Sequence, residues 1–446
     1  MLLFVFHANI SIITTDCRME VYSMKKVPLI NVVDVICHSF RHLDPRLINH
    51  GERVAYILMK MLDDTKRYTN QEKQDIFMLG LLHDIGAYKE KELDSILSFD
   101  LNDSMEHSVF GYLLFKTFSP LPEYADIILY HHHCNAQYYP VPISNYHRDI
   151  AKLIYLADRI DIFCVLNNAK DLDSFLSKCC GTIFLPSDIR WFQETEKKHR
   201  LLEKIDSLKY QEELRTYTRN HFSLTESQIH NYLMTFIFSV DFRNEYTALH
   251  TNYAVQLSEH ISDTLRLDVN SRSIIQLAAL LHNIGKISLP SRLSCAKDYD
   301  QYLTDLYRNS TLNVTREILE EAIDPQIIHI IDDSFLLLEC WSNNTPVTFK
   351  PAPATEIVAL SYLMSNTLTQ ELNVSRFYHP KLLSFLRQKY QTCKMDNSIL
   401  LTLERHFDKI IEKTQNSCSS IYNIYQQMMD EEHSLNMILL HYNNKY

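Results

Sequence analysis

Apolar residues recur along most of the chain at the three- and four-residue spacing of an amphipathic α-helix. In residues 28–42, for example, Val32, Val33 and Ile36 fall on one face of such a helix. Hydrophobic residues make up 46% of the 446 positions, which is enough to bury a sizeable core, and only six residues are glycine. The pattern therefore predicts an all-α protein, and the length is typical of two or three domains.

Composition excludes several classes of function. Scarce glycine argues against a Rossmann or P-loop phosphate site, since each needs several glycines within a few residues. A formal net charge of −11 disfavours nucleic-acid polymers and anionic membranes as partners. The ten cysteines show no Cys-x-x-Cys spacing, so we expect free thiols in a reducing cytoplasm. The first apolar run is too short to cross a bilayer, and we expect residues 1–23 to be a poorly ordered leader, with Met1 or Met24 as the true start.

The stretch Leu79–Gly86 joins an apolar helix to an adjacent polar pair, His83 and Asp84. Residues 76–82 are hydrophobic on every side, which is typical of a buried helix. Neighbouring residues on a helix point in different directions, and burying both polar groups without partners would cost several kcal/mol. A metal ion would satisfy both side chains. The alternative is a polar helix end near solvent.

Further histidines and an aspartate lie on apolar stripes within the same 110-residue region. Each one alone fits a core residue that is hydrogen-bonded to a backbone carbonyl. Taken together they would each need a separate partner, whereas one metal cluster inside a helical bundle accounts for all of them. The candidate metal ligands are His50, His83, Asp84, His107, His131, His132 and Asp158.

In order and spacing, these residues resemble the HD superfamily of metal-dependent phosphohydrolases, and within it the HD-GYP branch of cyclic-dinucleotide phosphodiesterases. The resemblance implies two or three divalent ions, usually iron or manganese, bridged by Asp84, with His83 and Asp84 as the catalytic pair. It also implies that the ions activate a water molecule, which attacks the phosphorus of a small phosphodiester. The matching segments are His50-Gly-Glu-Arg53-Val-Ala55, Leu81-Leu-His83-Asp84-Ile-Gly86, Met105-Glu-His107, Tyr130-His131-His132, Tyr155-Leu-Ala-Asp158 and Gly181-Thr-Ile-Phe-Leu-Pro186.

Three departures from the family pattern concern the substrate and the number of ions. Ala87 stands where the family has a lysine, and Lys89 is the nearest substitute. Tyr138-Tyr139-Pro140 stands in place of Gly-Tyr-Pro, and Arg46 replaces the glutamate of a third metal, so we expect two ions. The candidate substrate-binding residues are Arg53, Lys89 and Tyr139.

The motifs of the first half return roughly 200 residues later, which indicates a duplicated unit. His250 matches His50, and Leu280–Gly285 matches the central stretch. Asn283 cannot bridge ions as an aspartate can, and Tyr362 replaces the final aspartate. We therefore expect a degenerate, catalytically silent domain that supports the fold, dimerises or senses a ligand.

The sequence predicts a cytoplasmic all-α protein of two HD-type helical bundles. Residues 24–193 form the catalytic HD-GYP-like domain, 194–221 a charged, solvent-exposed helical linker, and 222–446 the degenerate domain. The predicted function is metal-dependent hydrolysis of a cyclic dinucleotide second messenger such as c-di-GMP. One alternative is an HD phosphohydrolase of nucleotides or other small phosphate esters; another is a non-catalytic tandem protein that binds a nucleotide or a partner. The expected partner is a small phosphodiester, with no nucleic-acid polymer and no membrane, and a homodimer is left open.

Overall fold

The computed structural model describes residues 29–42, 49–88, 105–132, 140–167, 169–242, 245–289, 301–370 and 379–443. The predicted leader, Lys89 and Tyr139 lie outside these ranges. The chain falls into two compact units, the first within Lys26–Arg243 and Met428–Tyr446, and the second within Asn244–Gln427. Every regular element of the described residues is helical, which confirms the all-α prediction. Among the described helices, none combines the length and the hydropathy that crossing a bilayer requires.

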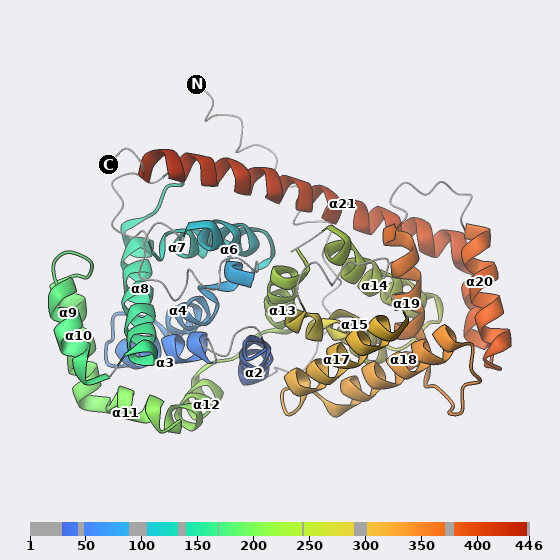
Figure 1. The fold of residues 1–446 in the computed structure, drawn as a ribbon, viewed down its shortest axis with the longest axis horizontal. Helices are drawn as coiled ribbons and strands as arrows, with labels where there is room; N and C mark the ends of the chain where they lie inside the picture. Colours follow the sequence, from blue (N-terminus) through green and yellow to red (C-terminus); the bar gives the residue numbers. More distant parts are fainter. Residues whose placement is uncertain are drawn as a thin grey trace. The chain divides into compact units, whose positions relative to one another are not determined.

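Five helices of the first unit form the bundle that carries the predicted ligands (Figure 1). The helix that begins at Asn70 starts with a capping box, in which the side chains of Thr69 and Glu72 each accept a hydrogen bond from the other residue's backbone N–H. The last begins at the cap Ser144, whose side chain accepts from the His147 N–H. These helices are α3 (His50–Asp63), α4 (Asn70–Leu82), α6 (Met105–Phe118), α7 (Ala125–Tyr130) and α8 (Asn145–Leu166).

A short 3₁₀ turn, η3 (Ile85–Tyr88), follows α4 and packs directly against α6. The contact depends on Gly86, because a Cβ atom there would lie 2.0 Å from the carbonyl oxygen of His107. Gly51 allows a similar approach of α3 to α4, where a Cβ would lie 2.4 Å from the Leu81 carbonyl oxygen. Glycine at these positions brings three helix ends close together, and those ends carry the polar residues.

The charged segment 194–221 differs from the exposed linker expected from its sequence. It folds into packed helices whose apolar side chains, including Leu201, Tyr210 and Leu214, are fully buried. The next helix contacts α6 and α2 (Leu29–Phe40), so the first unit continues to about residue 243 instead of ending near 193. Charge alternation marks only the outer face of these helices. The helices of the first unit that follow α8 are α9 (Leu172–Cys179), α10 (Pro186–His199), α11 (Leu201–Asp206), α12 (Lys209–His221) and α13 (Glu226–Asp241).

The helices of the second unit pack together in the same order as those of the first. The first helix contacts the second and the fifth, as α3 contacts α4 and α8, and the short turn η6 (Ile284–Ser288) packs against α17 as η3 packs against α6. The last helix is one continuous element of 46 residues, whose final part belongs to the first unit. The helices are α14 (Glu245–Thr264), α15 (Val269–Leu281), α17 (Gln301–Leu319), α18 (Pro325–Asn343), α19 (Pro353–Gln370), α20 (His379–Thr392) and α21 (Ser398–Asn443).

Candidate metal centre

Each predicted metal ligand lies at the end or on the inner face of a bundle helix, and the structure brings all seven together. His50 begins α3, and His83 and Asp84 follow α4. The other four lie on α6, after α7 and in the middle of α8. All five histidines are at most 5% exposed. Two groups of side chains could each hold an ion: His50, His83 and Asp84, and Asp84, His107, His131 and His132.

Asp84 belongs to both groups, and its two oxygens face different histidines. Its Oδ1 lies 3.4 Å from Nε2 of both His107 and His131. Its Oδ2 lies 3.6 Å from Nε2 of His50 and 3.3 Å from Nε2 of His83. Two atoms that bind one ion at about 2.0–2.2 Å lie roughly 3 Å apart, so these separations suit metal ligands. Asp84 is therefore placed to bridge two ions, one on each oxygen.

Asp158 completes the group that contains His50 and His83. Its Oδ1 lies 3.4 Å from His50 Nε2 and 3.9 Å from His83 Nε2. Its Oδ2 accepts hydrogen bonds from the neighbouring Arg159, at 2.9 Å from Nε and 2.8 Å from Nη2. The arginine thus occupies one carboxylate oxygen and leaves the other directed at the imidazoles.

Backbone carbonyls fix the orientation of two of the histidine rings. His83 Nδ1 lies 2.8 Å from the carbonyl oxygen of Gly80, and His131 Nδ1 lies 2.6 Å from that of Ile128. When Nδ1–H donates to a carbonyl, the lone pair is on Nε2, the atom that faces Asp84. The ends of α4 and α7 therefore hold both rings in the tautomer that binds a metal.

A carboxylate has the same role for His50. Asp161 Oδ2 lies 2.7 Å from His50 Nδ1, and Arg53 donates to both oxygens of that carboxylate, at 2.6 and 2.8 Å. Arg53, predicted from the resemblance to bind substrate, here supports a ligand through Asp161. Asp161 is not among the candidate ligands predicted from the sequence, although it lies on the same face of α8 as Asp158. Its three-residue spacing from Asp158 was the available signal.

The electrostatics of the centre favour positive charge between the imidazoles and the carboxylates. Burial alone lowers the pKa of His83, but the carboxylates of Asp84 and Asp158 outweigh it and raise the pKa to about 9. Burial likewise raises the pKa of Asp84, but the surrounding histidines bring it well below its usual value. Away from Asp158 the balance reverses, and burial lowers the pKa of His107 to about 3. Asp84 is thus ionised and His107 neutral, the forms that bind metals, and a metal ion would displace the proton that the carboxylates hold on His83.

The fit to metal ions can be tested on the hydrogen bonds that the cluster lacks. Nine buried nitrogen and oxygen atoms of these seven residues have no hydrogen-bond partner in the described part of the chain. An unsatisfied buried polar atom costs about 1–3 kcal/mol, so nine would cost on the order of 10 kcal/mol, comparable to the stability of a whole domain. Ions bonded to these atoms would remove that penalty. The residues therefore fit a centre of two divalent ions.

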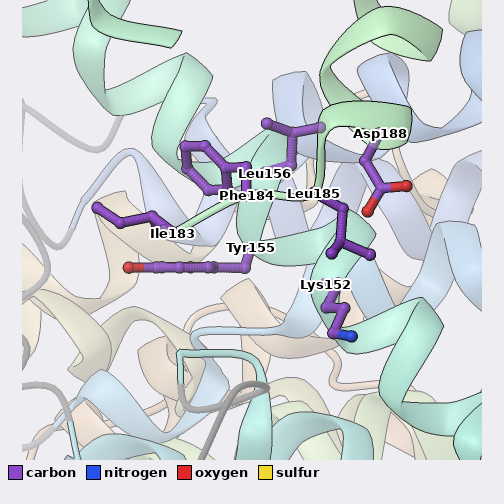
Figure 2. A pocket seen from close by; sticks show the side chains of 7 residues that line it. All are labelled: Lys152, Tyr155, Leu156, Ile183, Phe184, Leu185 and Asp188. Atoms are coloured by element: carbon purple, nitrogen blue, oxygen red, sulfur yellow. The ribbon is translucent and has the colours of Figure 1, made fainter. Parts of the chain in front are cut away.

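An aromatic wall lies beside the second ligand group. The Tyr155 ring packs edge-on against His132, with ring centroids 5.5 Å apart, and packs at a tilt against Phe184, with centroids 5.6 Å apart. Phe184 belongs to the closing motif 181–186, which is how that motif reaches the centre. A small pocket lies at this wall, with Lys152 and Asp188 on one side of it (Figure 2). Its lining residues are Lys152, Tyr155, Leu156, Ile183, Phe184, Leu185 and Asp188.

Comparison with protein families agrees with this geometry. The family model described as HD domain matches residues 47–162, which span every predicted ligand. Residues 47–162 are an HD domain. The HD domain supplies both ligand groups, and the helices from α9 onward lie outside the matched region.

Two proteins of Vibrio cholerae resemble the chain beyond this domain. One is the 3'3'-cGAMP-specific phosphodiesterase 1 of serotype O1, which is 25% identical over 261 residues. That match covers 55% of this chain and 60% of the relative, so the chain spans less than two thirds of the relative's length. The other is a crystal structure of a cyclic GMP-AMP specific phosphodiesterase. It aligns with a TM-score of 0.52 and 16% identity over 86% of this chain and 98% of that one, and supports the fold alone.

Proposed function

We propose that the protein is a metal-dependent phosphodiesterase that hydrolyses a phosphodiester bond of a cyclic dinucleotide. The observation that carries the proposal is Asp84, whose two oxygens each face a separate set of histidines. A bridged pair of ions is the usual machinery for hydrolysing phosphate esters. The substrate class is supported by the HD domain and by the printed activity of the Vibrio cholerae relative.

At a centre of two ions, some residues would bind the ions and others would hold those ligands in position. One ion would be held by His50, His83 and Asp158. The other would be held by His107 on α6 and by His131 and His132 at the end of α7, and Asp84 would join the two groups. Two divalent ions, which we propose to be iron or manganese, supply an activated water molecule and neutralise charge on the phosphoryl oxygens. Arg159 and Asp161 keep Asp158 and His50 in position.

Substrate contacts are proposed from the wall and from the neighbouring loops. Tyr155 and Phe184 form an aromatic wall next to His132, and although each residue is only 5% exposed, we propose that a nucleobase contacts the exposed edge of this wall. Lys152 adds positive charge at the same pocket (Figure 2). Lys89 and Tyr139 remain candidates from the family resemblance, outside the described residues. The choice among c-di-GMP, cyclic GMP-AMP and c-di-AMP is part of the test.

The decisive experiment combines metal content with hydrolysis of these three cyclic dinucleotides. The purified protein should contain about two ions per chain by mass spectrometry and should release a linear dinucleotide. Asp84→Ala should lose metal and activity together, whereas Asp149→Ala should keep both. Asp149 is a matched control because it lies on α8 with its side chain 46% exposed.

Two results would count against the proposal. Hydrolysis of simple nucleotides but of no cyclic dinucleotide would assign the chain to another class of HD phosphohydrolase. Full cyclic-dinucleotide hydrolysis by the Asp84→Ala protein would remove the bridging carboxylate from the mechanism altogether.

The second unit is proposed to be a degenerate copy that does not catalyse. A Cβ on Gly285 would lie 2.0 Å from the Thr311 carbonyl oxygen, as one on Gly86 would from that of His107, so a threonine occupies the third-ligand position. Asn283 and Tyr362 replace the two aspartates at equivalent places. With no carboxylate in these positions, the unit cannot bridge a pair of ions.

A further inference from the structure

The polar cluster at the centre of the second unit has lost the negative charge of its counterpart. The three aspartates of the first centre correspond to Asn283, Tyr362 and Ser365. This register rests on two contacts. The Tyr362 ring lies 5.0 Å from that of His250 and 5.1 Å from that of His282, as Asp158 contacts both equivalent histidines. Ser365 Oγ lies 2.8 Å from His250 Nδ1, where Asp161 contacts His50.

The arginines that hold the carboxylates of the first unit have no counterparts here. By the same register, Tyr253 stands for Arg53 and Leu363 for Arg159. Conversely, Lys286 stands where the first unit has Ala87. Carboxylates and their arginine partners are thus lost together, and one lysine is present instead. The sign of the charge at the centre is therefore inverted, from negative to positive.

The two histidines of this cluster bond to each other, so they do not require an ion. His250 Nε2 lies 3.3 Å from His282 Nε2, and His282 Nδ1 lies near the carbonyl oxygen of Ala279, at 2.5 Å. Ser365 Oγ lies 2.8 Å from both His250 Nδ1 and the Tyr362 carbonyl oxygen, and when its proton is directed at His250 each ring nitrogen has a partner while both rings are neutral. Burial, and then the charge of Lys286, lowers the pKa of both histidines, that of His282 to about 3. A cation is disfavoured here.

Two groups of this cluster are available for an anion. Asn283 is 6% exposed, and neither its Nδ2 nor its Oδ1 has a hydrogen-bond partner among the described residues. Lys286 is only partly buried, and it forms no ion pair with any residue in the described ranges. Tyr362, whose ring touches both histidines, is also partly exposed, so the cluster reaches the surface. Lys286 follows Asn283, the N-cap residue of η6, by three residues, and an ammonium together with an unused amide N–H is a donor set suited to a phosphate oxygen.

We propose that the second unit binds the phosphate group of a nucleotide through Asn283 and Lys286, at the place where the first unit holds its metal ligands. The unit would then act as a sensor of a phosphate-bearing ligand. The proposal depends on donors in the second unit and not on the activity of the first. Its test can therefore be made with the metal centre disabled.

The experiment uses the full chain with Asp84→Ala, dialysed against a chelator, and titrates it with inorganic phosphate in a calorimeter at constant ionic strength. We expect saturable binding at one site per chain. Lys286→Gln should weaken that binding by about tenfold or more, since it removes a charged hydrogen bond. Asn283→Asp should abolish it by placing a carboxylate beside the anion. Lys350→Gln, at an exposed lysine of the same unit, should bind as the parent protein does.

Competition by a cyclic and by a linear dinucleotide then separates the sources of the phosphate group. Displacement of phosphate by either nucleotide supports the proposal and identifies the ligand. If neither nucleotide displaces phosphate, the site binds only the free ion, and the nucleotide assignment is overturned. Absence of saturable binding, or equal binding by Lys286→Gln and the parent protein, overturns the site itself. Thermal melts by circular dichroism confirm that each variant is folded, and Lys286→Ala provides a second variant at the lysine.

Discussion

Replacing Asp161 with asparagine tests whether a residue that binds no ion itself controls one of the two ligand groups. The carboxylate lies 2.7 Å from His50 Nδ1 and accepts hydrogen bonds from Nε and Nη2 of Arg53. It therefore fixes the His50 ring and makes its Nε2 more basic. Asparagine keeps the shape and one oxygen but removes the charge. Only the ion held by His50, His83 and Asp158 should respond, since Asp161 contacts no ligand of the other group in the structure.

The expected loss of metal affinity follows from the kind of contact that the substitution removes. Removing a carboxylate behind a metal-bound histidine weakens metal binding by about 10–100-fold, or about 1.4–2.7 kcal/mol. Titration of metal-free protein with manganese against a fluorescent chelator should resolve two binding steps. Asp161→Asn should shift one step by this factor and leave the other within error. Asp149→Asn, at the exposed position on α8, serves as the control.

A double-mutant cycle makes the reasoning refutable. If Asp161 acts through His50, adding Asp161→Asn to His50→Ala should not weaken metal binding further. Two unshifted steps in the single variant would contradict the role assigned to the carboxylate. Equal shifts in both steps would indicate a general disturbance of the bundle instead of a local one.

Three further predictions rest on other parts of the structure. Gly86→Ala should lower the free energy of unfolding by about 3 kcal/mol in a chemical denaturation experiment, because its Cβ would lie 2.0 Å from the His107 carbonyl oxygen; an unchanged midpoint would contradict the close packing. Tyr155→Leu should raise KM several-fold with little change in metal content, and an altered metal content with normal KM would place the ring in the metal centre instead of the substrate wall. Burial raises the pKa of Glu356 from 4.5 to about 7, although the Tyr390 hydroxyl opposes this. The stabilising contribution of the protonated Glu356 carboxyl is therefore present below pH 4.5 and lost as pH rises through 7. Glu356→Gln should stabilise the protein by at most about 3 kcal/mol at pH 8 and leave its stability unchanged at pH 4. Equal effects at both pH values would refute the assignment.

Much of the site could be predicted because its residues stand at recognisable places on helices. His83 and Asp84 end an apolar run, and His50 begins the stripe of the preceding helix, so periodicity alone directs them to the core. Periodicity also predicts helices throughout, and every regular element of the described residues is helical. The packed position of α11 and α12 could not be predicted in this way. Their charged faces dominate the local composition, whereas three buried side chains decide where they lie.

By itself, the sequence determined the helical class of the protein and the seven polar residues that meet at the centre of its first unit, since both depend on spacing within single helices. Only the tertiary structure decided how those residues act on one another. The division of Asp84 between two groups, and the support of His50 by a residue 111 positions away, depend on how helices pack. The same holds for the inverted charge of the second unit, because proximity across helices is set by side-chain fit and not by local pattern.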